Sequence, residues 1–145
     1  MMSVIEVYIA GGWFSPVQLK AIEDIENACE SSGVSYFSPR KAGIWKPGDQ
    51  PEKLVLGNIR AIDNCITIIA STADKDMGTL WECGYAHAMG IPVSYYYTNT
   101  EHPFNIMLSA TATKVITDYD DLKLALGELL DNGSISYRKY TGDMQ

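Results

Sequence analysis

Apolar and polar positions follow two patterns that alternate along this chain. Short apolar runs, rich in β-branched and aromatic residues, are typical of buried strands. These runs cover residues 4–10, 34–37, 65–70, 93–97 and 114–117. The segments between them carry apolar residues at helical spacing or begin at capping residues, which predicts helices. The helices are expected at residues 16–33, 52–64, 76–90 and 122–130.

Smaller features complete the predicted organisation. Asp120 is expected to cap the last helix, and Ile135–Tyr137 has the composition of a short strand. Glycine, proline and charged residues dominate positions 40–51, and residues 98–103 are also polar, so both segments are predicted to be loops.

The regular alternation of strands and helices predicts the fold. Strands that are apolar throughout are typical of a parallel sheet covered by helices on both faces. Five such strands indicate an α/β protein with a flavodoxin-like (Rossmann-like) doubly wound sheet. Such sheets bind ligands outside the carboxyl ends of their strands. No repeat or linker divides the sequence, so residues 1–145 are expected to form one domain.

Composition narrows the class of partner. With 18 acidic and 11 basic residues, the chain is a poor match to a nucleic-acid-binding surface, which needs clustered Lys and Arg. Three scattered cysteines favour neither a disulfide framework nor a zinc site, and they suit a reducing compartment. No signal-like segment opens the chain and no apolar run approaches membrane-spanning length. We therefore expect a cytoplasmic protein that acts on a small molecule, with no membrane or nucleic-acid partner.

Residues 76–86 place two carboxylates, Asp76 and Glu82, around a predicted helix start. Glu82 is flanked by Trp81 and Cys83, so it is a charge in apolar surroundings. Burying an unpaired carboxylate costs roughly several kcal/mol, and a carboxylate kept at such a position is a candidate for a functional site. The alternative interpretation is a capping Asp76 followed by a half-exposed Glu82 on a solvated helix face.

In the predicted topology, segments that follow four strands meet at one edge of the sheet. These segments are residues 8–14, the chain from 38 onward, 71–82 and 97–107. The edge is rich in aromatic residues and holds the two carboxylates and Asn105. Flat aromatic walls around carboxylates suit a ligand with a planar ring and a polar, uncharged part. Because Lys75 is the one basic residue in the loop after the third strand, a multiply phosphorylated ligand has little to bind there.

These groups suit cleavage at an acetal-like carbon. A carboxylate nucleophile can attack C1 of a sugar, form a covalent glycosyl-enzyme and pass the sugar to a second acceptor. A tyrosine hydroxyl that donates to the carboxylate would orient it. A second carboxylate would supply or relay the proton that the departing group needs.

Three motifs in this chain resemble those of the nucleoside 2-deoxyribosyltransferase family. They are Tyr8-Ile9-Ala10-Gly11-Gly12-Trp13-Phe14, Asp76-x-Gly-x-x-x-Glu82-x-Gly-Tyr-Ala and Asn105-Ile106-Met107. They occur in the family's order and at similar separations, and the likeness extends over nearly the whole chain. The resemblance implies transfer of 2-deoxyribose between nucleobases through a covalent deoxyribosyl-glutamate, with retention and with no metal or organic cofactor. It also implies a role in nucleoside salvage.

The resemblance also assigns roles to the carboxylates and to the residues beside them. It implies that Glu82 is the nucleophile, that Tyr8 positions it, and that Asp76 assists proton transfer on the base side. Phe14 is expected to pack against the nucleoside, and Trp13 and Gly11 to contact it.

The third motif implies that the protein is a homo-oligomer. Asn105 and Met107 match positions that, in the family, reach into a neighbouring subunit's site and help to hold the sugar hydroxyl end. The expected partners are therefore a 2′-deoxynucleoside, a free nucleobase and further copies of this chain.

This chain departs from the family at the base side. Val55 falls where the family usually carries another aspartate, and the nearby polar residues are Asn58 and Asp63, of which Asp63 fits a helix end. Base protonation would then rest on Asp76, on Asp49 or on water.

Two other departures concern the contact to the nucleophile and the choice of base. Gln145 replaces the family's terminal aromatic residue, which in the family contacts the nucleophile. The segment 40–49, which should select the base, matches the family poorly, so the resemblance assigns no base preference.

Each motif residue also has an interpretation that involves no ligand. Tyr8 fits a core aromatic, Asp76 fits a helix cap, and Asn105 fits a turn residue. Cys83 and His87 lie four residues apart, on one helix face, which is the spacing of a thiol nucleophile and its base. A core cysteine and a partly exposed histidine explain both residues equally well.

Two other functions remain open at this level. One is an N-glycosidase that hydrolyses deoxynucleosides or nucleoside 5′-monophosphates, and the other is a non-catalytic nucleotide-binding module on the same sheet. A nucleotide hydrolase should carry extra basic or hydroxyl groups near the 5′ end, whereas Asn105-Ile106-Met107 and acidic surroundings favour a free 5′-hydroxyl. A pure binding module gains nothing from a desolvated carboxylate.

Overall fold

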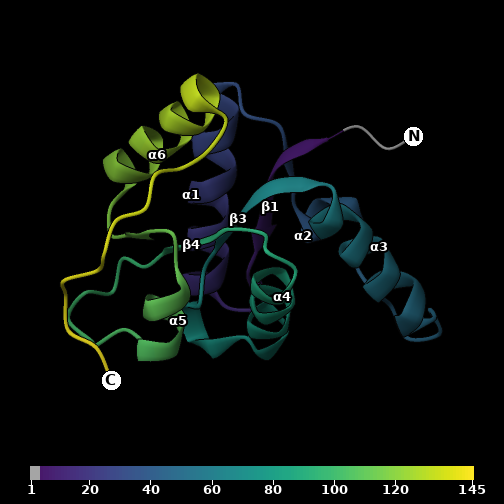
Figure 1. The fold of residues 1–145 in the computed structure, drawn as a ribbon. Helices are drawn as coiled ribbons and strands as arrows, with labels where there is room; N and C mark the ends of the chain where they lie inside the picture. The colour runs from purple at the N-terminus through teal and green to yellow at the C-terminus, as the bar shows by residue number, and fades with distance from the viewer. Residues whose placement is uncertain (1–3) are drawn as a thin grey trace.

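The computed structural model describes residues 4–145, in which helices alternate with strands (Figure 1). The strands are β1 (Ile5–Ala10), β2 (Tyr36–Phe37), β3 (Cys65–Ala70), β4 (Val93–Tyr96) and β5 (Val115–Ile116). The helices are α1 (Pro16–Ser32), α2 (Pro39–Ala42), α3 (Pro51–Asp63), α4 (Met77–Ala88), α5 (Ile106–Thr111) and α6 (Tyr119–Asn132), with a 3₁₀ turn, η1 (Ala73–Lys75), before α4.

The strands form one five-stranded parallel sheet in the order β2-β1-β3-β4-β5. This is the flavodoxin-like order, in which the chain switches direction between β1 and β3. The predicted fold class is confirmed, and each predicted strand lies within two residues of its observed bounds.

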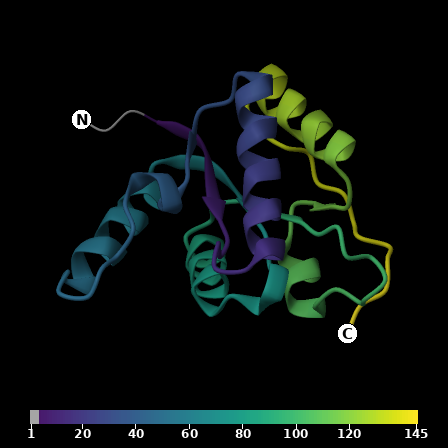
Figure 2. The same ribbon diagram turned by 180° about the vertical axis from the view of Figure 1, so that it is seen from behind.

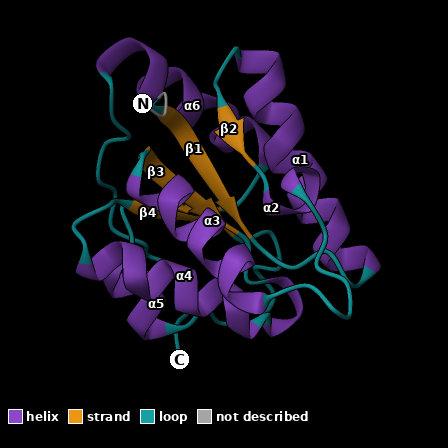
Figure 3. Cartoon of the chain, turned by 90° about the vertical axis from the view of Figure 1, so that its right-hand side faces the viewer, coloured by secondary structure: helices purple, strands orange, loops and turns teal. Residues whose placement is uncertain are grey.

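Helices cover both faces of the sheet, as Figure 3 shows. Because successive side chains of a strand point to opposite faces, Val7 and Ile9 join the core beneath α1 and α6. Tyr8 and Ala10 join the other core, beneath α3 and α4. Helices α1 and α6 lie side by side in both Figure 1 and Figure 2. The alternation within β1 therefore directs Tyr8 toward the α3–α4 face.

Two local predictions, the cap of the last helix and the strand that follows this helix, are wrong. The last helix is capped by Asp118, whose side chain accepts from the backbone N–H of Asp121, and Asp120 lies inside its first turn. The segment Ile135–Tyr137 is no strand. The chain after it contacts the sheet region through Arg138, whose N–H donates to the carbonyl of Thr113 and whose side chain donates to the carbonyl of Val115.

Two short helices were not predicted from the sequence pattern. Helix α2 occupies part of the predicted loop 40–51, and α5 follows Asn105. Asn105 caps α5 by accepting from the N–H of Leu108. The backbone of Gln145 pairs with that of Phe104, which brings the end of the described chain beside the start of α5.

Within residues 4–145, no helix combines the length and the apolar character needed to cross a membrane.

Candidate active site

A pocket of about 560 Å³ opens at the carboxyl ends of β1 and β3, where the chain switches direction. This is where doubly wound sheets bind their ligands. Its lining comes from the loop after β1, from the start of α2, from α3 and from α4. The lining residues are Gly11, Gly12, Trp13, Phe14, Pro39, Val55, Asn58, Ile59, Ile62, Asp76, Gly78, Trp81 and Glu82.

Glu82 lies on the wall of this pocket, and Tyr8 contacts it from the core without lining the pocket itself. Tyr8 is fully buried, and its hydroxyl donates a hydrogen bond to Oε2 of Glu82 on α4. The Tyr8 ring stacks on Phe37 of β2 at a centroid distance of 5.5 Å, which fixes the direction of the hydroxyl. Tyr8 is therefore both a core aromatic and a hydrogen-bond donor to the carboxylate.

The surroundings of Glu82 favour its protonated form. Burial raises the pKa of this carboxyl to about 7, the hydrogen bond from Tyr8 lowers it, and the charge of Asp76 raises it further. Burial and the nearby Glu82 also raise the pKa of Tyr8 well above its ordinary value, so its hydroxyl keeps its proton and remains a donor. Near neutral pH the ionised and protonated forms of Glu82 are therefore both populated, and the ionised form is poorly solvated.

Asp76 begins α4 and lines the pocket. Its Oδ2 accepts from the N–H of Thr79 at 3.0 Å and from the hydroxyl of Thr79 at 2.8 Å. Capping satisfies a donor that the first turn of a helix leaves unpaired. Within residues 4–145 no hydrogen bond is made to Oδ1, so the cap leaves one oxygen of this carboxylate free for a ligand.

Aromatic side chains form much of the rest of the wall. Trp13 and Phe14 pack together at a centroid distance of 4.9 Å, and Trp81 stacks on Tyr85 at 5.7 Å. Phe14 is 75% exposed although it lines the pocket, which leaves its ring free to contact a bound molecule.

Helix α3 contributes the fourth wall, through residues that the family resemblance had placed at the base side. Val55 and Asn58 both line the pocket, one helical turn apart, whereas Asp63 ends α3 and accepts from the hydroxyl of Tyr85 at 2.7 Å. The side chain of Asp49 accepts from the N–H of Lys46 and is not part of the lining. Asp76 is therefore the carboxylate that accompanies Glu82 in this pocket.

Gln18, on α1, is a further residue that sequence reasoning missed. Its side-chain oxygen accepts from the N–H groups of Phe14 and Ser15, and its amide nitrogen donates to the carbonyl of Ala73. One amide thus ties the loop after β1 to the loop after β3. The signal was the capping-box spacing, Ser15 followed three residues later by Gln18.

Gly12 is needed for this arrangement. A Cβ at Gly12 would lie 2.8 Å from the amide carbon of Gln18, closer than real Cβ contacts allow. The glycine pair therefore allows the loop after β1 to lie directly against α1 and to form the floor of the pocket.

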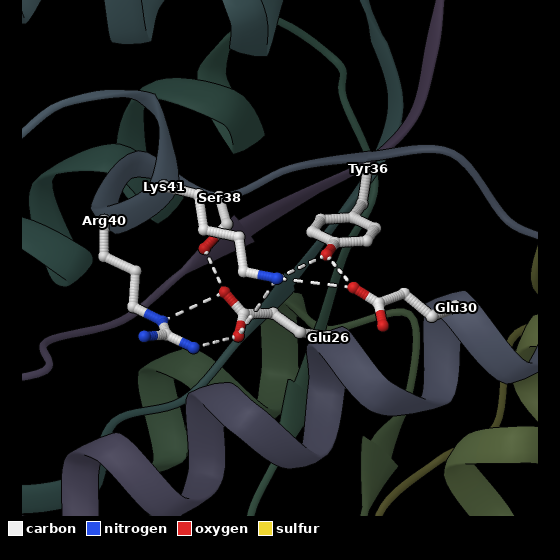
Figure 4. A network of polar contacts seen from close by, with 6 residues as sticks. All are labelled: Glu26, Glu30, Tyr36, Ser38, Arg40 and Lys41. Atoms are coloured by element: carbon white, nitrogen blue, oxygen red, sulfur yellow. Dashed lines mark hydrogen bonds and ion pairs between the residues drawn. The ribbon is translucent and has the colours of Figure 1, made fainter.

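A charged network holds the α2 side of the pocket (Figure 4). Glu26 on α1 is 2% exposed and accepts from the Ser38 hydroxyl at 2.7 Å and from Nε of Arg40 at 3.0 Å. Lys41 reaches Glu26 at 3.9 Å and Glu30 at 3.3 Å. Because Ser38 and Arg40 flank Pro39, the network fixes the residue through which α2 lines the pocket.

Three predicted site residues do not line this pocket: Tyr8, which is buried in the core beside Glu82, and Asn105 and Met107. Asn105 and Met107 lie at the start of α5, and Met107 is 71% exposed. All strands are parallel, so the segment 97–107 leaves β4 at the same edge of the sheet as the other three segments, as expected. It does not line this pocket, because β4 lies on the other side of β3 from β1.

The alternative of a thiol nucleophile is not supported by the geometry. Cys83 is 2% exposed and lies in the core, where burial raises its thiol pKa to about 12, whereas His87 is exposed. A buried neutral thiol is a poor nucleophile. Within residues 4–145, no three Cys, His, Asp or Glu side chains are grouped so as to hold a metal ion.

Fold and site together define a flavodoxin-like α/β protein with a tyrosine-bound carboxylate in an aromatic pocket at the switch point of the sheet. Sequence comparison agrees with this class. A model of the family described as nucleoside 2-deoxyribosyltransferase matches residues 7–129. The chain belongs to the nucleoside 2-deoxyribosyltransferase family, and it is a transferase whose substrates are nucleosides and nucleobases. No curated protein matches the sequence.

Solved structures share this fold at low sequence identity. A 2-deoxyribosyltransferase from Bacillus psychrosaccharolyticus superposes with a TM-score of 0.75 at 20% identity, over 92% of this chain and 98% of that one. A conserved protein from Enterococcus faecalis V583 gives 0.69 at 18% identity, over 87% and 99%. A 2-deoxyribosyltransferase from Leishmania mexicana gives 0.54 at 20% identity, over 97% and 83%.

Proposed function

We propose that this protein transfers 2-deoxyribose between nucleobases through a covalent deoxyribosyl-Glu82 intermediate, with retention at C1′. The observation that carries the proposal is the pairing of Glu82 with the Tyr8 hydroxyl inside an apolar pocket. The hydrogen bond occupies Oε2, so Oε1 remains the attacking oxygen. Poor solvation of this carboxylate favours its use as a nucleophile, because attack on C1′ removes its charge.

The reaction balances as two displacements at C1′. In the first, Oε1 of Glu82 bonds to C1′ while the N-glycosidic bond breaks and its electron pair leaves with the base. In the second, a nitrogen of the incoming base bonds to C1′ and the carboxylate is released. Each step inverts C1′, so the product keeps the starting configuration.

Asp76 is the group that exchanges a proton with the base. It lines the pocket and has Oδ1 free while Oδ2 caps α4. The leaving base takes a proton from this side chain directly or through water, and the incoming base returns one. Phe14, Trp13 and Gly11 contact the nucleoside from the loop after β1.

A second copy of the chain completes the sugar end of the site. Asn105 and Met107 lie outside the pocket of their own chain, at the exposed start of α5. In a homo-oligomer, α5 of one copy would bring both side chains to the deoxyribose of its neighbour.

The primary experiment measures base exchange without phosphate. The protein is incubated with thymidine plus adenine, and separately with deoxyadenosine plus thymine, and the products are separated by chromatography. New deoxynucleoside should form faster than free deoxyribose, and proton NMR should show the β-anomer. Free sugar alone would indicate an N-glycosidase instead, and no product from any common base would favour a binding module.

Two sets of variants test the roles. Glu82→Ala should abolish exchange, whereas Glu101→Ala, at an exposed glutamate, should retain it; more than a few per cent of activity in Glu82→Ala would exclude the nucleophile role. Mixed oligomers of Glu82→Ala and Asn105→Ala chains should regain activity. No recovery, with subunit mixing demonstrated, would contradict a shared site.

A further inference from the structure

The pocket lining contains one amide side chain, and the proposed reaction leaves it unused. Asn58, on α3, lines the pocket and is half-buried. Within residues 4–145, its amide makes no hydrogen bond to another residue. The other polar side chains of the lining, apart from the two indole rings, are the carboxylates of Asp76 and Glu82 on α4. Asn58 therefore lines the pocket from α3, whereas Asp76 and Glu82 line it from α4.

Apolar side chains surround Asn58 on its own wall. Val55, Ile59 and Ile62 of α3 all line the pocket, and Pro39 lies beside them in the lining. Such a wall packs against the flat face or rim of a planar ring but gives no direction to a hydrogen bond. The amide of Asn58 is the group on this wall that can tell one base edge from another.

An asparagine at this position has no structural reason visible in the fold. Asn is a poorer helix former than Leu in the interior of a helix, and Asn58 caps neither end of α3. Its amide is not fully buried, so water serves it in the free protein. A bound molecule that displaces this water must replace its hydrogen bonds.

We propose that Asn58 is the specificity-determining residue for the nucleobase, selecting bases whose edge presents a hydrogen-bond donor next to an acceptor. This inference rests on the proposed function. A primary amide offers one acceptor and two donors, which match such an edge in a bidentate pair. Because an amide exchanges no proton at neutral pH, Asn58 acts on the recognition of the base and leaves proton transfer to Asp76.

The test compares a base with an analogue of the same shape that lacks the donor. Adenine is paired with 6-methylpurine and cytosine with 4-methylpyrimidin-2-one, each as acceptor of deoxyribose. The wild-type protein should favour the natural base of the pair it uses best by about tenfold to a hundredfold in kcat/KM. Asn58→Leu should remove most of this preference while retaining exchange to the methylated analogue.

Matched variants separate base recognition from folding. Arg60→Leu makes the same replacement by leucine at an exposed position of α3, and it should keep the wild-type preference. Asn58→Asp keeps the size of the side chain but loses its donors, so it should lower kcat/KM for the natural base. Circular dichroism and thermal unfolding should show that all three variants fold.

The outcomes distinguish this inference from the proposed function. No exchange by the wild-type protein with any base would overturn the proposed function and, with it, the inference. Exchange with equal kcat/KM for a base and its analogue would overturn the inference alone. So would an Asn58→Leu variant that keeps the preference or loses both activities to the same degree.

Discussion

The substitution Glu82→Gln should make the protein more stable above neutral pH. Burial raises the pKa of Glu82 to about 7, so folding opposes the ionisation of this side chain. Glutamine has nearly the same shape, keeps a hydrogen-bond partner for Tyr8 and carries no charge to desolvate. The gain in stability would come with loss of base exchange, as expected of a carboxylate kept for chemistry.

The size and sign of the effect follow from the two pKa values. An ordinary glutamate titrates at 4.5 and Glu82 at about 7, and each pKa unit corresponds to about 1.4 kcal/mol. Between these values the folded state binds more protons than the unfolded state, so this group's contribution to stability falls as pH rises. The advantage of Glu82→Gln should therefore grow from near zero below pH 4.5 to about 3 kcal/mol above pH 7.

Urea unfolding of both proteins across this pH range measures the difference. The chain has 3 tryptophans, which provide a fluorescence signal, and other titrating groups cancel between the two proteins. Glu101→Gln, at an exposed glutamate, is the matched control and should change stability by less than about 0.5 kcal/mol. A Glu82→Gln advantage that is the same at both ends of the range would refute the reasoning, as would a variant less stable than wild type at pH 8.

Three further substitutions test the supports of the site. Asp76→Asn should leave stability within about 0.5 kcal/mol, because asparagine caps equally well, while exchange falls at least about tenfold. Its residual activity should reach its plateau at lower pH, since the charge of Asp76 raises the pKa of Glu82. Gln18→Leu breaks three hydrogen bonds and should lower the free energy of unfolding in urea by about 3 kcal/mol. An equal loss of stability in Gln50→Leu, at an exposed position, would contradict this prediction. Arg40→Met leaves the buried Glu26 without its main partner and should lower the free energy of unfolding by about 3–5 kcal/mol. Adding Glu26→Met to the same chain should restore part of this stability, and no recovery would mean that the loss has another cause.

The strands and the unusual position of Glu82 were predictable from local pattern, whereas the pairing of Tyr8 with Glu82 was indicated by the family resemblance. Runs such as 65–70 are apolar throughout, and only a strand buried on both faces suits them at that length. Glu82 stands out because a charge between apolar neighbours is rare on a surface helix. The buried position of Tyr8 and its bond to Glu82 then follow from strand alternation once the sheet order is known.

The α3 wall and the cap of α6 were not predictable from local pattern, whereas Asp76 was correctly offered as a cap. Val55 and Asn58 lie on a helix that projects from the body of the protein in Figure 1, and few of its residues are buried. With so little core contact, the sequence pattern does not say which side of the helix faces the pocket. Asp118 and Asp120 are equally good caps by composition, and the register of the preceding strand against β4 decides between them.

The bond between Tyr8 and Glu82 joins residues that are 74 positions apart in the chain. It forms only after β1 has paired with β3, since that pairing places Tyr8 beneath α4. Contacts of such long separation are slow to form, because the chain between them must first be ordered. During refolding, recovery of base exchange should therefore lag behind the return of helical circular dichroism, and it would report when the centre of the sheet has closed.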